Sequence, residues 1–153
     1  MIGEKFKGRR RDFFGNTSFS RNLLVTLMIY SGRDWEVISE TTRLMASKKC
    51  GLCKDAVPFS VEEASERLNE LPGWAIQSGS IRKEFRFRSY LSGLDFACSL
   101  GRIAELEDHH PDMLVGWRRV TVMLSTHAIK GLSVNDFIMA AKSELEYSRI
   151  AGR

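Results

Sequence analysis

Hydrophobic positions change their spacing several times after residue 58, and each change predicts a new element. Apolar residues at helical spacing predict three helices, over residues 61–71, 94–107 and 134–147. Alternating positions predict two strand pairs, 74–77 with 81–88 and 113–115 with 117–126. Short links within each pair indicate hairpins, so the sheet should be antiparallel. The predicted fold is α+β, a two-layer domain with a four-stranded antiparallel sheet and three helices on one face.

Each predicted helix begins with the same local signal, a serine three residues before an acid. The pairs are Ser60 with Glu63, Ser92 with Asp95, and Ser133 with Asp136. The serine hydroxyl can accept a hydrogen bond from an amide of the first turn. The acid can accept one from the serine amide or favour the positive end of the helix dipole. The repeated signal supports three separate helices.

The second strand pair is expected to turn around Gly116. Within it, Val120, Val122 and Leu124 point to one face, and the residues between them point to the other. A sheet that is half exposed in this way leaves edge strands that can pair with another copy of the chain. We therefore expect a homodimer or homotetramer.

Charge divides the chain near residue 45. Residues 1–44 hold eight basic and five acidic residues, a net +3, whereas residues 45–153 hold fifteen and fourteen, a net +1. We interpret residues 1–44 as a poorly ordered basic extension and residues 45–153 as the folded domain. Since the domain is nearly neutral, nucleic acid is not the expected partner. The apolar run 23–30 is too short to span a bilayer, although a targeting segment remains an alternative.

All three histidines of the chain, His109, His110 and His127, lie within one short stretch. Pro111 disfavours a helix at His110, so the adjacent pair should lie on a loop between helix and strand. His127 ends the last predicted strand, and in a hairpin the start of one strand is beside the end of its partner. The three imidazoles are therefore predicted to line one pocket near Asp108. Because histidine titrates near neutrality, this set could donate and accept protons in the loss or addition of water.

The same residues allow other interpretations. Three histidines could bind zinc, but adjacent residues point in different directions, so no metal is predicted. A histidine could also cap the C-terminus of a helix. Asp136 is explained structurally as the acid of a helix-capping pair, and Trp117 as a residue of the core or of a subunit interface.

A spaced set of residues resembles the signature of the pterin-4a-carbinolamine dehydratases. The set is Glu105, His109, His110, Pro111, Trp117, His127 and Asp136. The resemblance covers about residues 48–147, including the stretch from Leu71 to Trp74. Fixed residues at fixed spacings make it much more specific than one short motif. Vertebrate members of this family also act as dimerisation cofactors of a homeodomain transcription factor.

The resemblance implies dehydration of 4a-hydroxytetrahydropterin to quinonoid dihydropterin, which regenerates the cofactor after aromatic amino-acid hydroxylation. It implies His109, His110 and His127 as catalytic residues and a functional link to a hydroxylase. The pterin is the substrate, so no cofactor is expected. The implied pterin contacts are Asp108, Pro111, Ser125, Thr126, Ala128 and Trp74.

An alternative function is a non-catalytic interaction protein on the same fold, either a transcription coregulator or an assembly chaperone. Family members specialised in this way can lose active-site histidines. All three histidines are present in this chain, which favours the enzyme.

Three cysteines are too few for a disulfide framework and suggest a reducing, cytoplasmic location. Cys50 and Cys53 form half of a zinc or redox motif, and we expect free thiols in a mobile leader. Cys98 lies inside the second predicted helix and is expected to be a small core residue.

Overall fold

A computed structural model describes residues 38–53 and 56–151 of the chain. All of these residues belong to the compact unit Trp35–Arg153. The other unit, Met1–Asp34, lies outside the described residues, and so does most of the extension predicted for residues 1–44.

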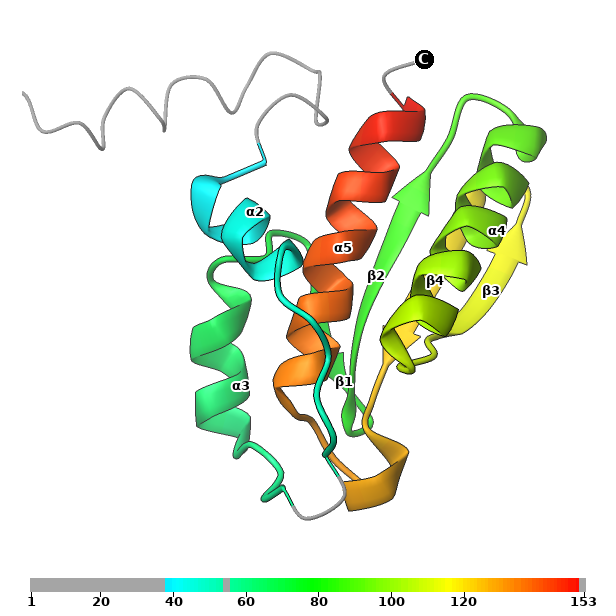
Figure 1. The fold of residues 1–153 in the computed structure, drawn as a ribbon. Coiled ribbons are helices and arrows are strands. Elements are labelled where there is room, and N and C mark those ends of the chain that lie inside the picture. The colour runs from blue at the N-terminus through cyan, green and yellow to red at the C-terminus, as the bar shows by residue number, and fades with distance from the viewer. Residues whose placement is uncertain (1–37, 54–55, 152–153) are drawn as a thin grey trace, which may run out of the picture. The chain divides into compact units, whose positions relative to one another are not determined.

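Four antiparallel strands form a single sheet in the order β1-β2-β4-β3 (Figure 1). They are β1 Ala75–Gln77, β2 Ser80–Arg86, β3 Asp112–Gly116 and β4 Arg119–Leu124. In the register, Val120 of β4 lies opposite both Phe85 of β2 and Val115 of β3. Because side chains alternate along a strand, this register places the apolar residues of three strands on the same face. The predicted antiparallel sheet is confirmed.

The helices cover one face of this sheet. Among the described residues they are α2 Glu40–Ala46, α3 Val61–Leu68, α4 Tyr90–Glu107 and α5 Val134–Ala151, with a 3-10 helix, η1 His127–Ile129. Figure 1 shows α5 running across the middle of the sheet, with α4 on one side and α2 and α3 on the other. The predicted α+β class is confirmed, with one α-helix, α2, that the hydrophobic pattern did not indicate.

An aromatic cluster packs the two long helices, α4 and α5, against the sheet. The ring of Phe85 in β2 lies 5.0 Å from the ring of Phe96 in α4 and 5.0 Å from that of Tyr147 in α5, between centroids. Phe85 and Phe96 are fully buried, as are Val120 and Val122 beside them. Burial of one such side chain stabilises a fold by roughly 1.5–3 kcal/mol. These contacts therefore fix the positions of α4 and α5, which carry the site described below.

Helix α4 begins earlier than the sequence indicated. Its N-cap is Ser89, whose hydroxyl accepts a hydrogen bond from the amide of Ser92 at 3.0 Å. The prediction of Ser92 as the cap is therefore wrong, because a serine with the same capping ability stands three residues earlier. The capping box of α3 is confirmed by both of its reciprocal hydrogen bonds, between Ser60 and Glu63.

The hairpin between β3 and β4 turns one position later than predicted. Gly116 is still part of β3 and pairs with Arg119, so the turn consists of Trp117 and Arg118. Arg118 has a φ of 55°, the left-handed conformation, at the second central position of the turn, where a type II turn has a positive φ. A non-glycine residue therefore makes the reversal, and the expected turn at Gly116 is corrected.

Helix α2 crosses the boundary that charge suggested at residue 45. The helix begins at Glu40 and buries Thr42 and Ala46. The hydroxyl of Thr42 also donates to the carbonyl of Glu70 at 2.9 Å, which joins α2 to the end of the α3 segment. The folded part of the chain therefore starts before residue 45.

Cys50, Cys53 and Cys98 are all free thiols. Cys50 Sγ lies 3.9 Å from the carbonyl oxygen of Asn135, and Cys53 Sγ lies 3.4 Å from Ser133 Oγ. Both thiols thus pack against the start of α5, and their expected place in a mobile leader is wrong. Cys98 is exposed, so its expected role in the core is also wrong.

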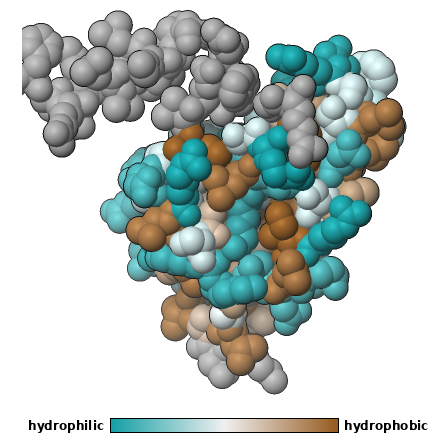
Figure 2. All heavy atoms as spheres, turned by 45° about the horizontal axis from the view of Figure 1, so that its top comes forward, coloured by the Kyte–Doolittle hydropathy of each residue, from teal (hydrophilic) through white to brown (hydrophobic). Residues whose placement is uncertain are grey.

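Apolar side chains on the face seen in Figure 2 form small separate patches between polar ones. Scattered apolar residues of this kind are ordinary on a protein surface. In the part of the chain that the structure describes, no helix is long and apolar enough to cross a membrane.

Candidate active site

The chain reverses directly after α4, and this reversal sends two adjacent histidines in different directions. Asp108, the C-cap residue, has φ 50° and ψ 38°, the left-handed conformation. The amide of His109 then donates back to the carbonyl of Ala104 at 3.2 Å, closing the helix end. As a result His109 is buried, with 8% of its surface exposed, whereas the side chain of His110 is 55% exposed.

A buried carboxylate holds His109. Its Nε2 lies 2.8 Å from Oδ1 of Asp136, which stands in the first turn of α5 and is completely buried. The other oxygen of Asp136 accepts hydrogen bonds from the Thr126 hydroxyl at 2.8 Å and from the Ser133 amide at 2.7 Å. A buried carboxylate is costly unless it is well paired, and these three partners satisfy it.

Asp136 therefore has two roles. Its bond to the Ser133 amide is half of the predicted capping pair and is confirmed. The other bond of the capping pair differs from the expected one. The Ser133 hydroxyl accepts from the amide of Asn135 at 3.2 Å, and it also bonds the Thr126 hydroxyl at 2.7 Å. Beyond the capping role that the sequence indicated, Asp136 joins the loop after α4 to the end of β4.

The pair of His110 and Glu105 is the exposed counterpart of this buried pair. Nε2 of His110 lies 2.8 Å from Oε1 of Glu105, and the carboxylate side chain is 78% exposed. Exposed pairs contribute about 0–1 kcal/mol to stability because water screens them. This contact therefore orients the His110 ring in solvent without anchoring the fold.

His127 is the first residue of η1 and is exposed. The residue before it, Thr126, exchanges two backbone hydrogen bonds with Gly131, at 2.8 and 3.4 Å, which close the loop around η1. Gly131 is required at this point, because a Cβ there would lie 2.7 Å from Cβ of Pro58. The His127 segment is thus tied to Asp136 through the side chain of its neighbour Thr126.

The structure brings together the two segments that the family resemblance implied. Asp112, directly after the histidine loop, pairs with Met123, directly before the residues at the end of β4. Of the implied pterin contacts, Asp108 and Ala128 are exposed, Pro111 and Ser125 are partly exposed, and Thr126 is buried. The expected proximity of the two segments is confirmed, while the contacts to pterin remain predictions.

Trp74, the remaining implied pterin contact, lies in the core and not in the two histidine segments. Its side chain is buried against Phe85, and its indole nitrogen donates to Glu144 at 2.7 Å. Glu144 is eight residues along α5 from Asp136, roughly 12 Å at 1.5 Å per residue. The structure thus shows Trp74 in the core, and its part in substrate binding remains a prediction.

Trp117 is 75% exposed and stacks on Tyr90, with 6.3 Å between the ring centroids. A place in the core is therefore excluded, because the residue stands at the tip of the hairpin turn. A place in a subunit interface remains a prediction.

A second buried carboxylate lies at the end of α4. Glu107 accepts from the Cys50 amide at 2.8 Å and pairs with Lys49 and Lys142 at 3.2 and 3.3 Å. Burial acts to raise the pKa of Glu107, but these hydrogen bonds and charges outweigh it and lower the pKa below 4.5. Burial, with the nearby Glu107 carboxylate, raises the pKa of the Cys50 thiol to about 12. This cluster joins the end of α4 to the segment after α2 and to α5.

Ser133 and Thr126 bond the Asp136 carboxylate that holds His109. The sequence pattern did not indicate this role for either residue. The only local signal was the capping pair of Ser133 with Asp136, and Thr126 was implied by resemblance alone. Among the described residues, no group of three or more His, Cys, Asp or Glu side chains is arranged to hold a metal ion.

Comparison with known proteins relates this chain to one protein family. The family model described as pterin 4 alpha carbinolamine dehydratase matches residues 57–145. A protein of Nitrosospira multiformis is 44% identical over 99 residues, which cover 64% of this chain and 88% of that protein. A protein of Rubrobacter xylanophilus is 43% identical over 100 residues, covering 64% and 94%. The names of both assign them to the pterin-4-alpha-carbinolamine dehydratases.

A solved structure agrees with this relationship. The crystal structure of a transcriptional coactivator/pterin dehydratase from Brucella melitensis matches with a TM-score of 0.54 and 30% identity, over 62% of this chain and 99% of that one. The region matched by the family model contains α3 to α5 of this chain except the last turns of α5, and with them the whole histidine site. The chain therefore belongs to the pterin 4 alpha carbinolamine dehydratase family.

Proposed function

We propose that this protein is a hydro-lyase that dehydrates 4a-hydroxytetrahydropterin to quinonoid dihydropterin. The observation that carries the proposal is the contrast between two adjacent histidines, one buried on Asp136 and one exposed beside Glu105. Family membership supplies the pterin, and the histidines supply the acid and base that the reaction needs.

The reaction requires two proton movements. The bond from C4a to the hydroxyl oxygen breaks, the oxygen takes a proton and leaves as water, and N5 loses its proton as the C4a–N5 double bond forms. No electrons are exchanged with another molecule, so the proposal needs no cofactor. A histidine that is protonated can donate to the leaving oxygen, and a neutral histidine can accept from N5.

The geometry suggests how the roles divide. His110 and His127 are exposed, and they belong to the two segments that the pairing of Asp112 with Met123 brings side by side. His109 has its Nε2 engaged by Asp136, which fixes the ring and leaves Nδ1 as its remaining polar atom. In the proposal the exposed rings exchange protons with the substrate, while His109 presents a fixed polar contact.

The proposal extends to the setting of the reaction. Its substrate would come from an aromatic amino-acid hydroxylase, and its product would re-enter tetrahydropterin recycling in the cytoplasm after a separate two-electron reduction to tetrahydropterin. A homodimer or homotetramer is proposed from the exposed edges of the sheet, because β1 and β3 each have only one strand neighbour among the described residues.

The competing function is protein interaction without catalysis. The Brucella melitensis protein is described both as a transcriptional coactivator and as a pterin dehydratase, so the comparison alone does not separate the two activities. The presence of all three histidines favours the enzyme. A stoichiometric protein partner, together with no pterin binding by calorimetry, would reverse this preference.

A hydroxylase-coupled assay tests the proposal directly. The wild-type protein should accelerate the loss of the 4a-carbinolamine absorbance, and His110→Ala and His127→Ala should each reduce this rate by about 10²-fold or more. Arg102→Gln, an exposed change on the same helix α4, serves as the matched control and should keep the wild-type rate. Equal rates for the wild type and both histidine variants would refute the dehydratase.

A further inference from the structure

A cavity lies at the end of α4 that is far from the histidine loop. It has a volume of about 190 Å³, opens to solvent, and is lined by the residues after β2, the first turn of α4, the hairpin turn and the last turns of α5. Ser92 lies in the first turn of α4, whereas the histidine loop follows its last residue, Glu107. The 18 residues of α4 span about 27 Å, so this cavity is separate from the histidine site.

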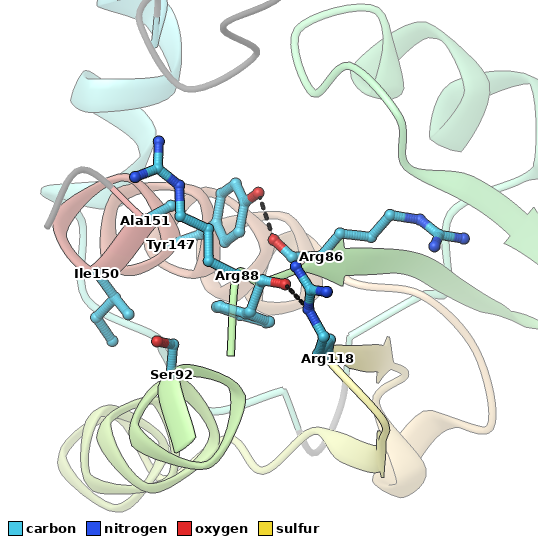
Figure 3. Close-up of a pocket in the computed structure, with 8 residues that line it drawn as sticks. Arg86, Arg88, Ser92, Arg118, Tyr147, Ile150 and Ala151 are labelled. Carbon is cyan, nitrogen blue, oxygen red and sulfur yellow. Dashed lines mark hydrogen bonds between the residues drawn. The ribbon is translucent and has the colours of Figure 1, made fainter. Parts of the chain in front are cut away.

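The charged groups around this cavity are all positive. Among the described residues that line it are Arg86, Arg88 and Arg118, and no carboxylate is among them. Figure 3 shows the Arg86 side chain running away from Tyr147 and Ser92, and this guanidinium pairs with Glu84 at 2.6 Å. Arg88 and Arg118 therefore supply the positive charge of the cavity.

The two arginines are placed differently. Arg118 Nε donates to the carbonyl of Phe87 at 3.2 Å, which steadies the guanidinium beside the cavity. The Arg88 side chain runs towards the end of α5 (Figure 3). A guanidinium has five N–H donors in a planar fork, so one bond to a carbonyl leaves Arg118 with capacity for an anion.

The other side chains that line the cavity are partly apolar and partly polar. Phe87 and Ile150 are buried apolar side chains, and Ser92 and Tyr147 add hydroxyl groups. The Tyr147 hydroxyl donates to the carbonyl of Arg86 at 2.8 Å, which holds the end of α5 against the strand. An occupant would therefore meet an apolar surface on one side and guanidinium groups on the other.

The volume limits the size of that occupant. Sites for drug-sized ligands measure about 300–1,000 Å³, well above this one. An apolar cavity of about 150 Å³ accepts benzene, and a water molecule occupies about 30 Å³. The 190 Å³ available here therefore suits one small ring together with a compact polar group.

We propose that this cavity is a binding site for a small organic anion, a single flat apolar group that carries a carboxylate or a phosphate. The apolar group packs on Phe87 and Ile150, and the anionic group bonds the guanidinium of Arg118, which the Phe87 carbonyl already holds beside the cavity. A free metabolite and the side chain or terminus of a partner protein share this chemistry, and small-molecule titrations measure the first of these.

A purely structural role for the arginines is the competing explanation. The cavity includes the last turns of α5, and cations near a helix C-terminus stabilise its dipole. In that case Arg88 and Arg118 would act on the stability of the fold alone, and no anion would bind.

Calorimetric titration of the full chain with phenyl phosphate and benzoate separates the two explanations. We expect binding with a dissociation constant on the order of 1 mM for at least one of these anions. Arg118→Gln should weaken it about tenfold or more, and Arg88→Gln should weaken it by a smaller factor, because the Arg88 guanidinium runs towards the end of α5 in Figure 3. Arg86→Gln is the matched control, because the Arg86 guanidinium pairs with Glu84. This variant should change the dissociation constant by no more than about twofold.

Two further comparisons define the ligand class. Benzyl alcohol, which lacks the charge, and inorganic phosphate, which lacks the ring, should both bind at least about tenfold more weakly than the better organic anion. His110→Ala should leave the binding curve unchanged, which excludes binding at the histidine site. Absence of anion binding, equal loss with Arg86→Gln, or equal binding of inorganic phosphate would each overturn the proposal.

Discussion

His109 and Asp136, 27 residues apart in the sequence, form a buried pair with 2.8 Å between Nε2 and Oδ1. The carboxylate is completely buried and also accepts from Thr126 and Ser133. One residue thus begins a helix and orients a histidine at the same time. This relationship joins the stability of the fold to the geometry of the proposed active site, and the first two predictions separate these contributions.

Asp136→Ala should destabilise the fold by about 3 kcal/mol or more. It removes the acceptor for His109, Thr126 and the Ser133 amide, and all of these groups are buried. Asp136→Asn should cost less stability, because an amide can still accept from one side and donate from the other. It would nevertheless favour the wrong His109 tautomer and lower kcat/KM about tenfold or more. Denaturant unfolding and the coupled assay measure the two effects, with exposed Asp95→Asn as the control.

His109→Ala and His110→Ala should differ in stability although both lower activity. The first leaves Asp136 without one of its partners in a buried site, at a cost of about 2 kcal/mol or more. The second removes an exposed contact to Glu105 and should change stability by less than about 1 kcal/mol. Thermal unfolding of both variants tests this difference. Equal losses of stability would show that the two environments are not as distinct as the structure indicates.

Asp108 should tolerate asparagine but not a β-branched residue. Its φ of 50° is favourable for Asp and Asn, whose short polar side chains accept the left-handed conformation. We expect Asp108→Asn to change the free energy of unfolding by less than about 0.5 kcal/mol and Asp108→Val to cost about 1–2 kcal/mol. Urea denaturation measures both. Similar values for the two variants would contradict the role of this residue in reversing the chain.

Glu107 should make the protein sensitive to acid. Its pKa is lowered in the folded state from an ordinary 4.5, so the unfolded chain binds a proton at higher pH than the folded chain. The stability from Glu107 is complete above pH 4.5 and is lost as the pH falls through the lower, folded-state pKa. Glu107→Gln should therefore be less stable than the wild type at pH 7, and the difference should shrink in acid. Exposed Glu66→Gln should show no such change.

Cys50 and Cys98 should react with an alkylating agent at different rates. Cys98 is exposed, whereas the pKa of Cys50 is raised to about 12 by burial and by the Glu107 carboxylate. Since the thiolate is the reactive form, Cys50 should remain unmodified at pH 8 long after Cys98 has reacted. Mass spectrometry after timed iodoacetamide treatment gives the order. Glu107→Gln should not accelerate Cys98, which makes Cys98 an internal reference.

Local signals predicted the elements well where the partners are close in sequence. The capping box of Ser60 and Glu63 involves neighbours only and is present as expected. At α4 the same signal failed, because Ser89 offered an equivalent cap one turn earlier. Helix α2 was missed because it is only seven residues long, and its buried face depends on contacts with distant parts of the chain.

The candidate site could be predicted only in outline. Pro111 and the hairpin register placed the two histidine segments side by side, and the structure agrees. The separation of His109 from His110 depends on the left-handed Asp108 and on a carboxylate 27 residues away, and no local sequence signal indicates that this carboxylate pairs with His109. Family resemblance supplied the substrate, which the residue spacing by itself does not specify.

The double role of Asp136 has an evolutionary consequence. Under the proposed function, a descendant that abandoned catalysis could replace His110 or His127 at little cost in stability, because both side chains are exposed. The same descendant would have to keep His109 and Asp136 for stability alone. In relatives of this chain, the loss of the exposed histidines should therefore mark a change of function, whereas survival of the buried pair carries no information about activity.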